Sequence, residues 1–447
     1  MWLVHFIEKF FQFFLPKSVR MSLSKIRISI YDFFGFLAIP YYYCISKRYN
    51  SIIKKVKGKQ TVKVVFFVHQ DAIWKYDSIF RCMQNHTRFH PVIAVIPYIN
   101  YGFKNMLAEM NKTYNAFVNK GYETVKTYDE ISQKWLNIKK ELNPDLIFFT
   151  TPFRITKPQY LVNNFTDRLT VYVPYGFMCA NIQSEQFNQA LHNTVWRCFY
   201  ETAVHKQLAQ KYASNKGKNV VAAGYPDCDI FIDKNYIPVD NWKNKNPNIK
   251  RIIWAPHHTL EANAKLYCYS TFLRYYDFMF DLLEKYKGQL QIAFKPHPIL
   301  KLKLFEHPDW GIEKTENYYK KWNNHPYGQL EESDYKDLFI TSDAMIYDSI
   351  SFLSEYCYTA KPALFLVNNN KVKEMFNEFG KQVFELSYMA YSEDDILNFI
   401  QQTVFDNINP LHEKRLNFVK QVLIPQGDKT ATQNIIDYLV DTLKLQI

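Results

Sequence analysis

The sequence predicts an α/β protein built from two doubly wound domains, each a parallel sheet with helices on both faces. The chain has 447 residues, enough to bury more than one core. Apolar residues make up 47% and charged residues 22%, a composition typical of a folded protein. From residue 61 onward, short continuous apolar runs alternate with helical patterns, as in sheets covered on both faces. An Asn- and Pro-rich stretch, residues 234–250, separates two such sets.

The N-terminal segment, residues 1–60, differs from the rest. Trp2–Leu15 places aromatic side chains at helical spacing and has no small-residue cleavage site, so we expect no cleaved signal peptide. Ile28–Ile45 is apolar but interrupted by Asp32 and Pro40, whereas a spanning helix needs about 20 apolar residues. We expect peripheral attachment to an anionic membrane surface on its cytoplasmic face. A spanning helix, or helices packed on the body, are the alternatives.

Charge and cysteine content narrow the class of protein. The formal net charge is +12, but residues 1–60 alone hold eleven Lys and Arg against two acidic residues. The body therefore carries little excess charge, which argues against a nucleic-acid partner. The seven cysteines are scattered and include no Cys-x-x-Cys pair. This pattern favours free thiols in a reducing compartment over disulfides or a zinc site.

The first domain, which we expect to bind the acceptor, is predicted over residues 61–240. Apolar runs predict its strands at Val62–Val68, Pro91–Ile96, Asp145–Thr150, Leu169–Val173 and Asn219–Ala223. Helical patterns lie around Ser78–Asn85 and Phe103–Lys120.

The second domain, which we expect to bind the donor, is predicted over residues 241–415, and residues 416–447 are expected to form helices that pack back on the body. Its predicted strands are Arg251–Ala255, Gln289–Phe294, Asp343–Tyr347 and Ala363–Val367, with a helix around Tyr269–Lys287 and a last one at Thr430–Leu445. Two such domains facing each other place a cleft at the carboxyl ends of both sheets, which is the default site.

The stretch Ser342–Val367 reads as a strand, a hydroxyl-rich turn, a helix and a second strand. Ser349 and Ser351 stand where the helix is predicted to begin. Their hydroxyls can cap it or share its N–H groups with an anion, so a phosphate could bind there.

Polar side chains also follow three other predicted strands. They are Tyr175 and Gly176 after the fourth strand of the first domain, and His257, His258, Lys295 and His297 after the first two strands of the second. Cations, imidazoles and hydroxyls at strand ends suit a phosphorylated ligand.

Each of these features also has a purely structural interpretation. Lys295–Pro298 could be a simple turn, the serines ordinary helix caps, and Gly176 present for its backbone freedom. His257 and His258 lack a third ligand at a recognisable spacing, so no metal site is predicted.

Taken in order, the Tyr-Gly turn, His-His, Lys-Pro-His-Pro, Asp-Ser-x-Ser-x-x-x-Glu and Lys-Pro-x-x-Phe elements resemble the CDP-glycerol glycerophosphotransferase family, the teichoic-acid primases and polymerases. The resemblance covers roughly residues 165–370 and implies a GT-B architecture without a cofactor. It implies transfer of glycerol phosphate, or a similar polyol phosphate such as ribitol phosphate, from a CDP-activated donor. The acceptor would be a hydroxyl of a lipid-linked molecule or polysaccharide, and CMP would leave.

The resemblance also assigns roles to single residues. His297 is similar to the family's second histidine, which contacts the donor pyrophosphate and helps CMP leave, and Lys295 could add a cation. Asp348 and Ser351 fall on the segment that holds phosphate. Glu355 is similar to an acidic residue that accepts hydrogen bonds from the ribose, and it shares a helix face with Ser351.

The sequence departs from the family at its first motif, His-Gly-x-Pro-Leu-Lys. The corresponding stretch here begins with Tyr175, and a tyrosine, with a pKa near ~10, is a poor base at neutral pH. Either His257, His258 or His69 substitutes, or Tyr175 is activated, or the acceptor chemistry differs; we favour a substitute base.

Two other functions are compatible with the sequence. A GT-B glycosyltransferase would use a nucleotide sugar in the same cleft, and a non-catalytic membrane-bound scaffold could have kept the fold after losing its base. Turnover of CDP-polyols or of nucleotide sugars would distinguish the enzymes, while nucleotide binding without turnover would indicate the scaffold.

Overall fold

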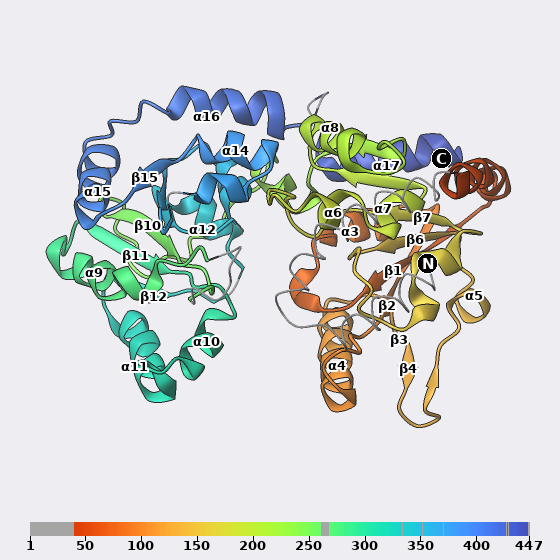
Figure 1. Cartoon of the computed structure of the whole chain (residues 1–447), viewed down its shortest axis with the longest axis horizontal. Coiled ribbons are helices and arrows are strands. Elements are labelled where there is room, and N and C mark those ends of the chain that lie inside the picture. Colours follow the sequence, from red (N-terminus) through yellow and green to blue (C-terminus); the bar gives the residue numbers. More distant parts are fainter. Residues whose placement is uncertain are drawn as a thin grey trace, which may run out of the picture.

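Two parallel sheets form the scaffold of the protein (Figure 1). The computed structural model describes residues 40–260, 268–332, 334–350, 352–369, 371–425, 427 and 429–445. The first sheet has seven strands in the order β3-β2-β1-β6-β7-β8-β9, and the second has six in the order β12-β11-β10-β13-β14-β15. Helices cover both sheets, so the predicted pair of doubly wound domains is confirmed.

Every strand pair in the first sheet is parallel. Its strands are β1 (Val62–Val68), β2 (Phe89–Val95), β3 (Thr124–Lys126), β6 (Leu146–Phe149), β7 (Leu169–Tyr172), β8 (Arg197–Tyr200) and β9 (Val220–Ala222). In the central strand β1 all residues except Lys63 are buried, which explains its continuous apolar sequence. Strands β3 and β8 were not predicted, because β3 is short and polar and β8 begins with Arg197.

Helices and one hairpin connect these strands. They are η1 (Asp71–Ile73), α3 (Asp77–Asn85), α4 (Phe103–Asn119), the hairpin of β4 (Tyr128–Asp129) and β5 (Lys134–Trp135), α5 (Ile138–Glu141), η2 (Pro158–Tyr160), η3 (Val162–Phe165), α6 (Gln183–Phe187), α7 (Ala190–Thr194), α8 (Ala203–Tyr212) and η4 (Pro226–Phe231).

The second sheet is also fully parallel. Its strands are β10 (Lys250–Ala255), β11 (Leu290–Phe294), β12 (Gly328–Leu330), β13 (Ala344–Tyr347), β14 (Ala363–Leu366) and β15 (Tyr388–Ala390). Its helices are α9 (Phe272–Lys285), α10 (Leu300–Glu306), α11 (Gly311–Asn324), α12 (Lys336–Thr341), α13 (Leu353–Cys357), η5 (Val372–Met375), α14 (Glu378–Phe384), α15 (Glu393–Asn398), η6 (Phe399–Phe405), α16 (His412–Phe418) and η7 (Val419–Leu423). The edge strands β12 and β15 were not predicted, since each has only three residues.

The last helix, α17 (Ala431–Leu443), returns to the first domain and packs against α3 (Figure 1). The Thr430 hydroxyl caps it by accepting the N–H of Gln433 at 3.1 Å. The buried Asp229 carboxylate accepts the next free N–H groups, those of Ala431 at 2.7 Å and Thr432 at 2.9 Å. The chain therefore begins and ends its described part on the same domain.

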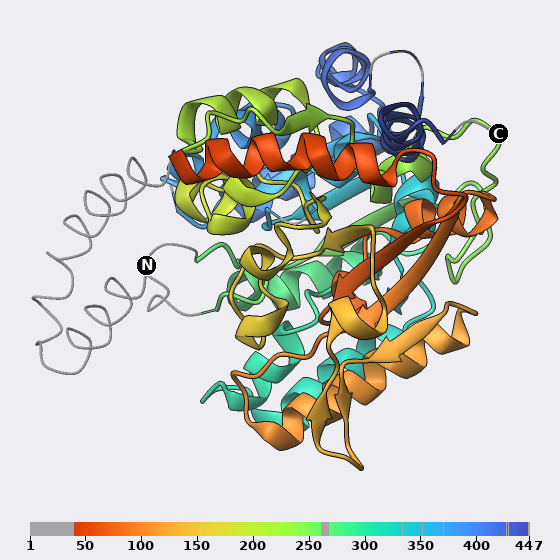
Figure 2. The same ribbon diagram turned by 90° about the vertical axis from the view of Figure 1, so that its right-hand side faces the viewer.

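A helix over residues 40–56 lies along the outside of the first domain (Figure 2). Ile45, Tyr49, Ile52 and Val56 form its buried face. The Tyr49 hydroxyl lies 2.7 Å from the Thr170 hydroxyl and also reaches a backbone carbonyl. None of the helices in the described part of the chain is long and apolar enough to cross a membrane. The expected amphipathic segment Trp2–Leu15 and most of Ile28–Ile45 lie outside the described residues.

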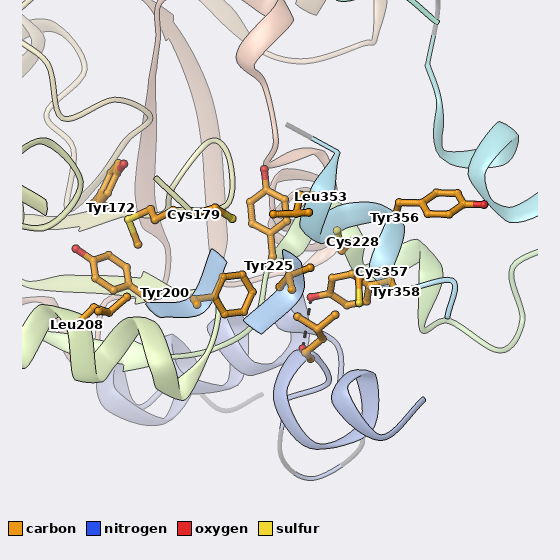
Figure 3. Packing of buried hydrophobic residues seen from close by; sticks show 14 of the residues in the cluster. Tyr172, Cys179, Tyr200, Leu208, Tyr225, Cys228, Leu353, Tyr356, Cys357 and Tyr358 are labelled. Atoms are coloured by element: carbon orange, nitrogen blue, oxygen red, sulfur yellow. Dashed lines mark hydrogen bonds between the residues drawn. The ribbon is translucent and has the colours of Figure 1, made fainter. Parts of the chain in front are cut away.

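An apolar cluster continues from one domain into the other (Figure 3). On α13 and just after it, Leu353, Tyr356 and Tyr358 are buried in the same cluster as Tyr225 and Cys228 of the first domain. Because these side chains share one core, the two domains are joined by an apolar contact as well as by the connecting chain.

Backbone groups also join the domains, between the segment after β7 and the start of α14. Asn377 donates its N–H to the Cys179 carbonyl at 2.8 Å, and Asn181 donates its N–H to the Met375 carbonyl at 2.8 Å. Gly380 permits this approach, since a Cβ on it would lie 2.5 Å from the Cys179 oxygen. We call these two paired segments, residues 179–181 and 375–380, the interdomain joint.

Candidate active site

Three imidazoles gather at the carboxyl edge of the second sheet. His257 and His258 follow β10 and His297 follows β11, and the two strands are neighbours. The ring centroids are 4.3 Å apart for His257 and His258, 4.3 Å for His258 and His297, and 5.0 Å for His257 and His297. The sequence predicted each of these histidines separately, and the fold places them in one cluster.

The His297 ring is oriented by its own turn. Its Nδ1 accepts the backbone N–H of Ile299 at 3.2 Å, so in the neutral ring the proton sits on Nε2. The Nδ1 atoms of His86, His307 and His325 likewise accept the backbone N–H of the second residue after them. The local turn therefore sets this tautomer, with or without a following proline, and the position after β11 decides what Nε2–H faces.

The His257 ring has the same tautomer for a different reason. Its Nδ1 lies 3.0 Å from the Thr259 hydroxyl, which already accepts the N–H groups of Tyr269 at 2.9 Å and Ser270 at 3.4 Å. With both lone pairs engaged, this hydroxyl donates to Nδ1, and Nε2 carries the proton. Burial lowers the pKa of His257 to about 2 and that of His297 to about 4, so both are neutral N–H donors at pH 7.

This arrangement does not fit a metal ion. The ring nitrogens of the three histidines lie within 4.8 Å of one another, which is close enough for a shared ion. A ligand nitrogen must offer a lone pair while the other ring nitrogen donates its N–H to an acceptor. In His257 and His297 the Nδ1 atoms are acceptors, so their Nε2 atoms carry hydrogens. Convergent N–H groups suit an anion.

Lys295 adds a cation on the same turn as His297. The Lys295 side chain is buried, and burial lowers the pKa of its ammonium. Its Nζ lies 3.4 Å from the Glu331 carbonyl and 5.8 Å from the centroid of the Tyr335 ring. The cluster thus combines neutral donors with one positive charge, as phosphate recognition requires.

Asp348, at the end of β13, is fully buried and its carboxylate is occupied by protein donors. It accepts the N–H of His257 at 2.6 Å, and the N–H and hydroxyl of Thr271 at 2.5 and 2.9 Å. Burial raises the pKa of Asp348 to about 6, although these hydrogen bonds act to lower it. Asp348 therefore fixes the position of the His257 turn and the segment before α9.

The predicted helix cap at Ser349 is wrong. The helix α13 begins only at Leu353, the N-cap position is Phe352, and no side chain caps it. Ser349 is buried between β13 and this helix. Ser351 lies outside the described residues. The helix begins later than the sequence suggested, so Ser349 precedes it rather than capping it.

Glu355 belongs to a buried ionic network that the sequence did not reveal. The Tyr335 hydroxyl donates to its carboxylate, and Lys75 lies 3.0 Å from that hydroxyl and 2.8 Å from Asp227. Lys336 binds the other Asp227 oxygen at 2.6 Å. Lys75 and Asp227 come from the first domain, and the other three from the second. Sequence reasoning missed this network because its four charged side chains come from stretches that are far apart in the chain.

The turn after β7 carries the tyrosine that replaces the family histidine. Burial raises the pKa of Tyr175, so even less of it is ionised to the basic phenolate at neutral pH than in a free tyrosine. Gly176 needs no special backbone freedom, because its φ is not positive and a Cβ on it would meet nothing within 4 Å. That interpretation of Gly176 is wrong, and the open space leaves room for a ligand. His69, at the end of β1, is buried and lines a separate cavity of the first domain.

Solved structures with the same fold span nearly the whole chain. A UDP-N-acetylglucosamine 2-epimerase from Listeria monocytogenes superposes with a TM-score of 0.54 at 12% identity, over 87% of this chain and 98% of its own. The S. aureus MnaA–UDP structure gives 0.53 at 16%, over 87% and 98%. A variant of the wall teichoic acid polymerase TagF gives 0.52 at 13%, over 96% and 98%. No curated protein sequence matches the chain significantly.

The family assignment comes from the sequence between residues 181 and 441. Residues 181–441 match the model of the CDP-Glycerol:Poly(glycerophosphate) glycerophosphotransferase family. The matched region spans the histidine cluster, Lys295, Asp348 and Glu355, and it covers more than half of the chain. The chain belongs to this glycerophosphotransferase family and is an enzyme of the CDP-glycerol glycerophosphotransferase type.

Proposed function

We propose that the protein transfers glycerol phosphate, or a similar polyol phosphate, from its CDP-activated form to a hydroxyl of a lipid-linked or polysaccharide acceptor in cell-surface polymer synthesis, releasing CMP. The observation that carries this proposal is the set of Nε2–H donors on His257 and His297 beside Lys295. In a chain of this family, such an anion receptor suits the donor pyrophosphate.

In the proposed reaction, the acceptor oxygen attacks the β-phosphorus of the donor, and the bond from that phosphorus to the CMP oxygen breaks. A loose phosphoryl-transfer transition state needs placement and charge stabilisation more than covalent chemistry. The imidazole N–H groups and the Lys295 ammonium would stabilise the charge that develops on the leaving CMP. Asp348 would keep His257 in place through its backbone N–H.

The remaining predicted residues would act around this centre. Glu355 would accept a hydrogen bond from the ribose while Tyr335 orients its carboxylate. Ser349 and Ser351 would bind near the donor phosphates, as the family resemblance implies, and the open space at Gly176 would leave room for a substrate.

The donor can be identified by measuring CMP release and product formation with labelled CDP-glycerol, CDP-ribitol and common UDP- and CMP-sugars. We expect turnover of a CDP-polyol and none of the sugars. In His297→Ala the rate should fall at least ~100-fold, because one donated hydrogen bond to the transition state is lost. His307→Ala is the matched control, since His307 has the same His-Pro turn but lies outside the cluster. Wild-type CMP release by His297→Ala would refute the assignment.

We also propose peripheral membrane attachment through the N-terminal segment. On the helix over residues 40–56, Tyr41 and Tyr43 are 46% and 57% exposed, and Lys47, Arg48 and Lys54 are exposed beside them. Exposed aromatic rings and cations along this helix suit an anionic membrane, and Tyr43, Lys47 and Lys54 share one face of it. The full chain should sediment with vesicles containing phosphatidylglycerol and not with pure phosphatidylcholine. Charge-removing changes at Lys47, Arg48 and Lys54 should weaken this binding several-fold; unchanged binding would contradict the role of the helix.

A further inference from the structure

The first domain has a hollow at the carboxyl edge of its own sheet. It measures about 500 Å3, including space open to solvent, and its lining includes residues that follow three neighbouring strands: His69 after β1, Ile96 after β2 and Thr151 after β6. Arg154 and Tyr160 also line it. In a doubly wound domain, the carboxyl edge is where ligands bind.

His69 is the histidine that lines this hollow. Its side chain is 5% exposed, and its Nδ1 has no hydrogen-bond partner among the described residues. Its ring lies 5.5 Å from that of Tyr98, and Tyr98 is close enough to Tyr175 for the two to interact electrostatically. His69 is therefore linked through one ring to the turn where the family histidine is missing.

The histidines of the second domain belong to the donor cluster. His257 and His297 carry a proton on Nε2 and have Nδ1 occupied, and His258, whose Nδ1 also has no partner among the described residues, packs against both of their rings. Tyr175 is made less acidic by burial. Burial lowers the pKa of His69 to about 4, opposed by a backbone group of Ile96, so His69 has a free lone pair at neutral pH.

We propose that this hollow binds the acceptor and that His69 is the general base for the transfer. The inference rests on the proposed function. As the acceptor oxygen bonds to the β-phosphorus and the CMP oxygen leaves, the acceptor hydroxyl gives its proton to the unprotonated nitrogen of His69. The proton then passes to solvent, and neutral His69 is restored for the next cycle.

The lining indicates the class of acceptor. The Arg154 side chain is exposed and forms no ion pair or hydrogen bond within the described residues. Phe153, which also lines the hollow, is 38% exposed beside it, whereas Tyr101, 74% exposed, lies outside the lining and next to Tyr98. A guanidinium and aromatic rings together suit a phosphorylated polyol or sugar, with its phosphate on Arg154 and its C–H faces on the rings.

The test compares variants of the full chain with CDP-glycerol as donor and glycerol 3-phosphate or glycerol as acceptor. In His69→Gln, transfer should fall at least ~100-fold, while the Kd for CDP-glycerol stays within twofold. His69→Gly should regain activity when imidazole is added, which a purely structural histidine would not do. Arg154→Gln should raise KM for glycerol 3-phosphate at least ~5-fold with kcat little changed, and leave KM for glycerol unchanged.

His90→Gln is the matched control, because His90 is exposed, pairs with Glu123 and lies outside the hollow. Wild-type transfer by His69→Gln would overturn the proposal, as would loss of activity that imidazole cannot restore. If His69→Gln does not fold, Arg154→Gln still tests whether the hollow binds the acceptor, because Arg154 is exposed. An unchanged KM for glycerol 3-phosphate in that variant would mean that the acceptor binds elsewhere. Failure of the wild-type chain to bind or turn over CDP-glycerol would instead refute the proposed function.

Discussion

At the residue scale, the protein controls chemistry mainly through burial and local hydrogen bonds. His257 and His297 are neutral donors because Thr259 and the Ile299 backbone occupy their Nδ1 atoms. The residue types were predictable from the sequence, since polar side chains follow apolar strands. Their tautomers were not, because each depends on a partner that only the folded turn brings near. The same holds for Glu355, whose partners Tyr335 and Lys75 are remote in the sequence.

Glu201, a buried acid close to the interdomain joint, should make the stability of the protein depend on pH. Burial raises the pKa of Glu201 to about 8, above its value of about 4.5 in the unfolded chain. Its contribution to stability is therefore complete below pH ~4.5 and is lost as the pH rises through 8. Glu201→Gln keeps an oxygen for the Met178 N–H, which Glu201 accepts at 3.0 Å, and cannot ionise.

We expect Glu201→Gln to match the wild type near pH 5 and to be more stable by at least ~1 kcal/mol at pH 9. Denaturant unfolding at both pH values measures this. Parallel pH profiles for the two proteins would show that Glu201 ionises without cost in the folded state.

At the element scale, the sequence predicted most of the central strands of both sheets but few of their short edge strands. Continuous apolar runs such as Val62–Val68 identified the central strands, because both faces of those strands are covered. Short edge strands such as Tyr388–Ala390 pair on one side only and carry a mixed pattern. The start of α13 was misplaced because serine is a common cap, yet here the turn continues to Phe352.

The close backbone approach at the interdomain joint predicts that replacing Gly380 destabilises the protein. Gly380→Ala would place a Cβ 2.5 Å from the Cys179 carbonyl, so α14 must shift away from the segment after β7. We expect a loss of about 1–3 kcal/mol in the free energy of unfolding, measured by denaturant titration. Gly176→Ala is the control for stability, since its Cβ would meet nothing within 4 Å. Equal stability of both variants would mean that the joint is not closely packed.

At the scale of the whole molecule, two kinds of contact hold the domains together. The joint pairs backbone groups, whereas the Lys336–Asp227 ion pair and the hydrogen bond from Lys75 to Tyr335 cross the boundary through side chains. The two-domain architecture followed from the repeated strand–helix alternation and the Asn- and Pro-rich stretch. The ionic contacts could not be predicted, because no local pattern relates Lys75 to Tyr335, 260 residues away.

Removing Lys75 should weaken this boundary. In Lys75→Met, Asp227 and Glu355 lose a shared cation in a site where both carboxylates are buried. We expect a loss of about 1–3 kcal/mol in stability and faster hydrogen exchange in α12 and α13. Lys59→Met is the control: its pair with Asp145 is more exposed and lies within the first domain, so we expect a change below ~1 kcal/mol. Unchanged exchange in α12 and α13 would rule out a bridging role for Lys75.

The side-chain contacts of Lys75 and the backbone pairing of the joint differ in how easily they can break. Ion pairs can dissociate and re-form as water and substrate compete for them, while the backbone pairing at Cys179 and Asn377 is directional and adjoins an apolar core. If the two domains separate during turnover, we expect the joint to act as the hinge and the contacts of Lys75 to break first. Tyr175 lies four residues from the joint, so we expect the turn after β7 to move least.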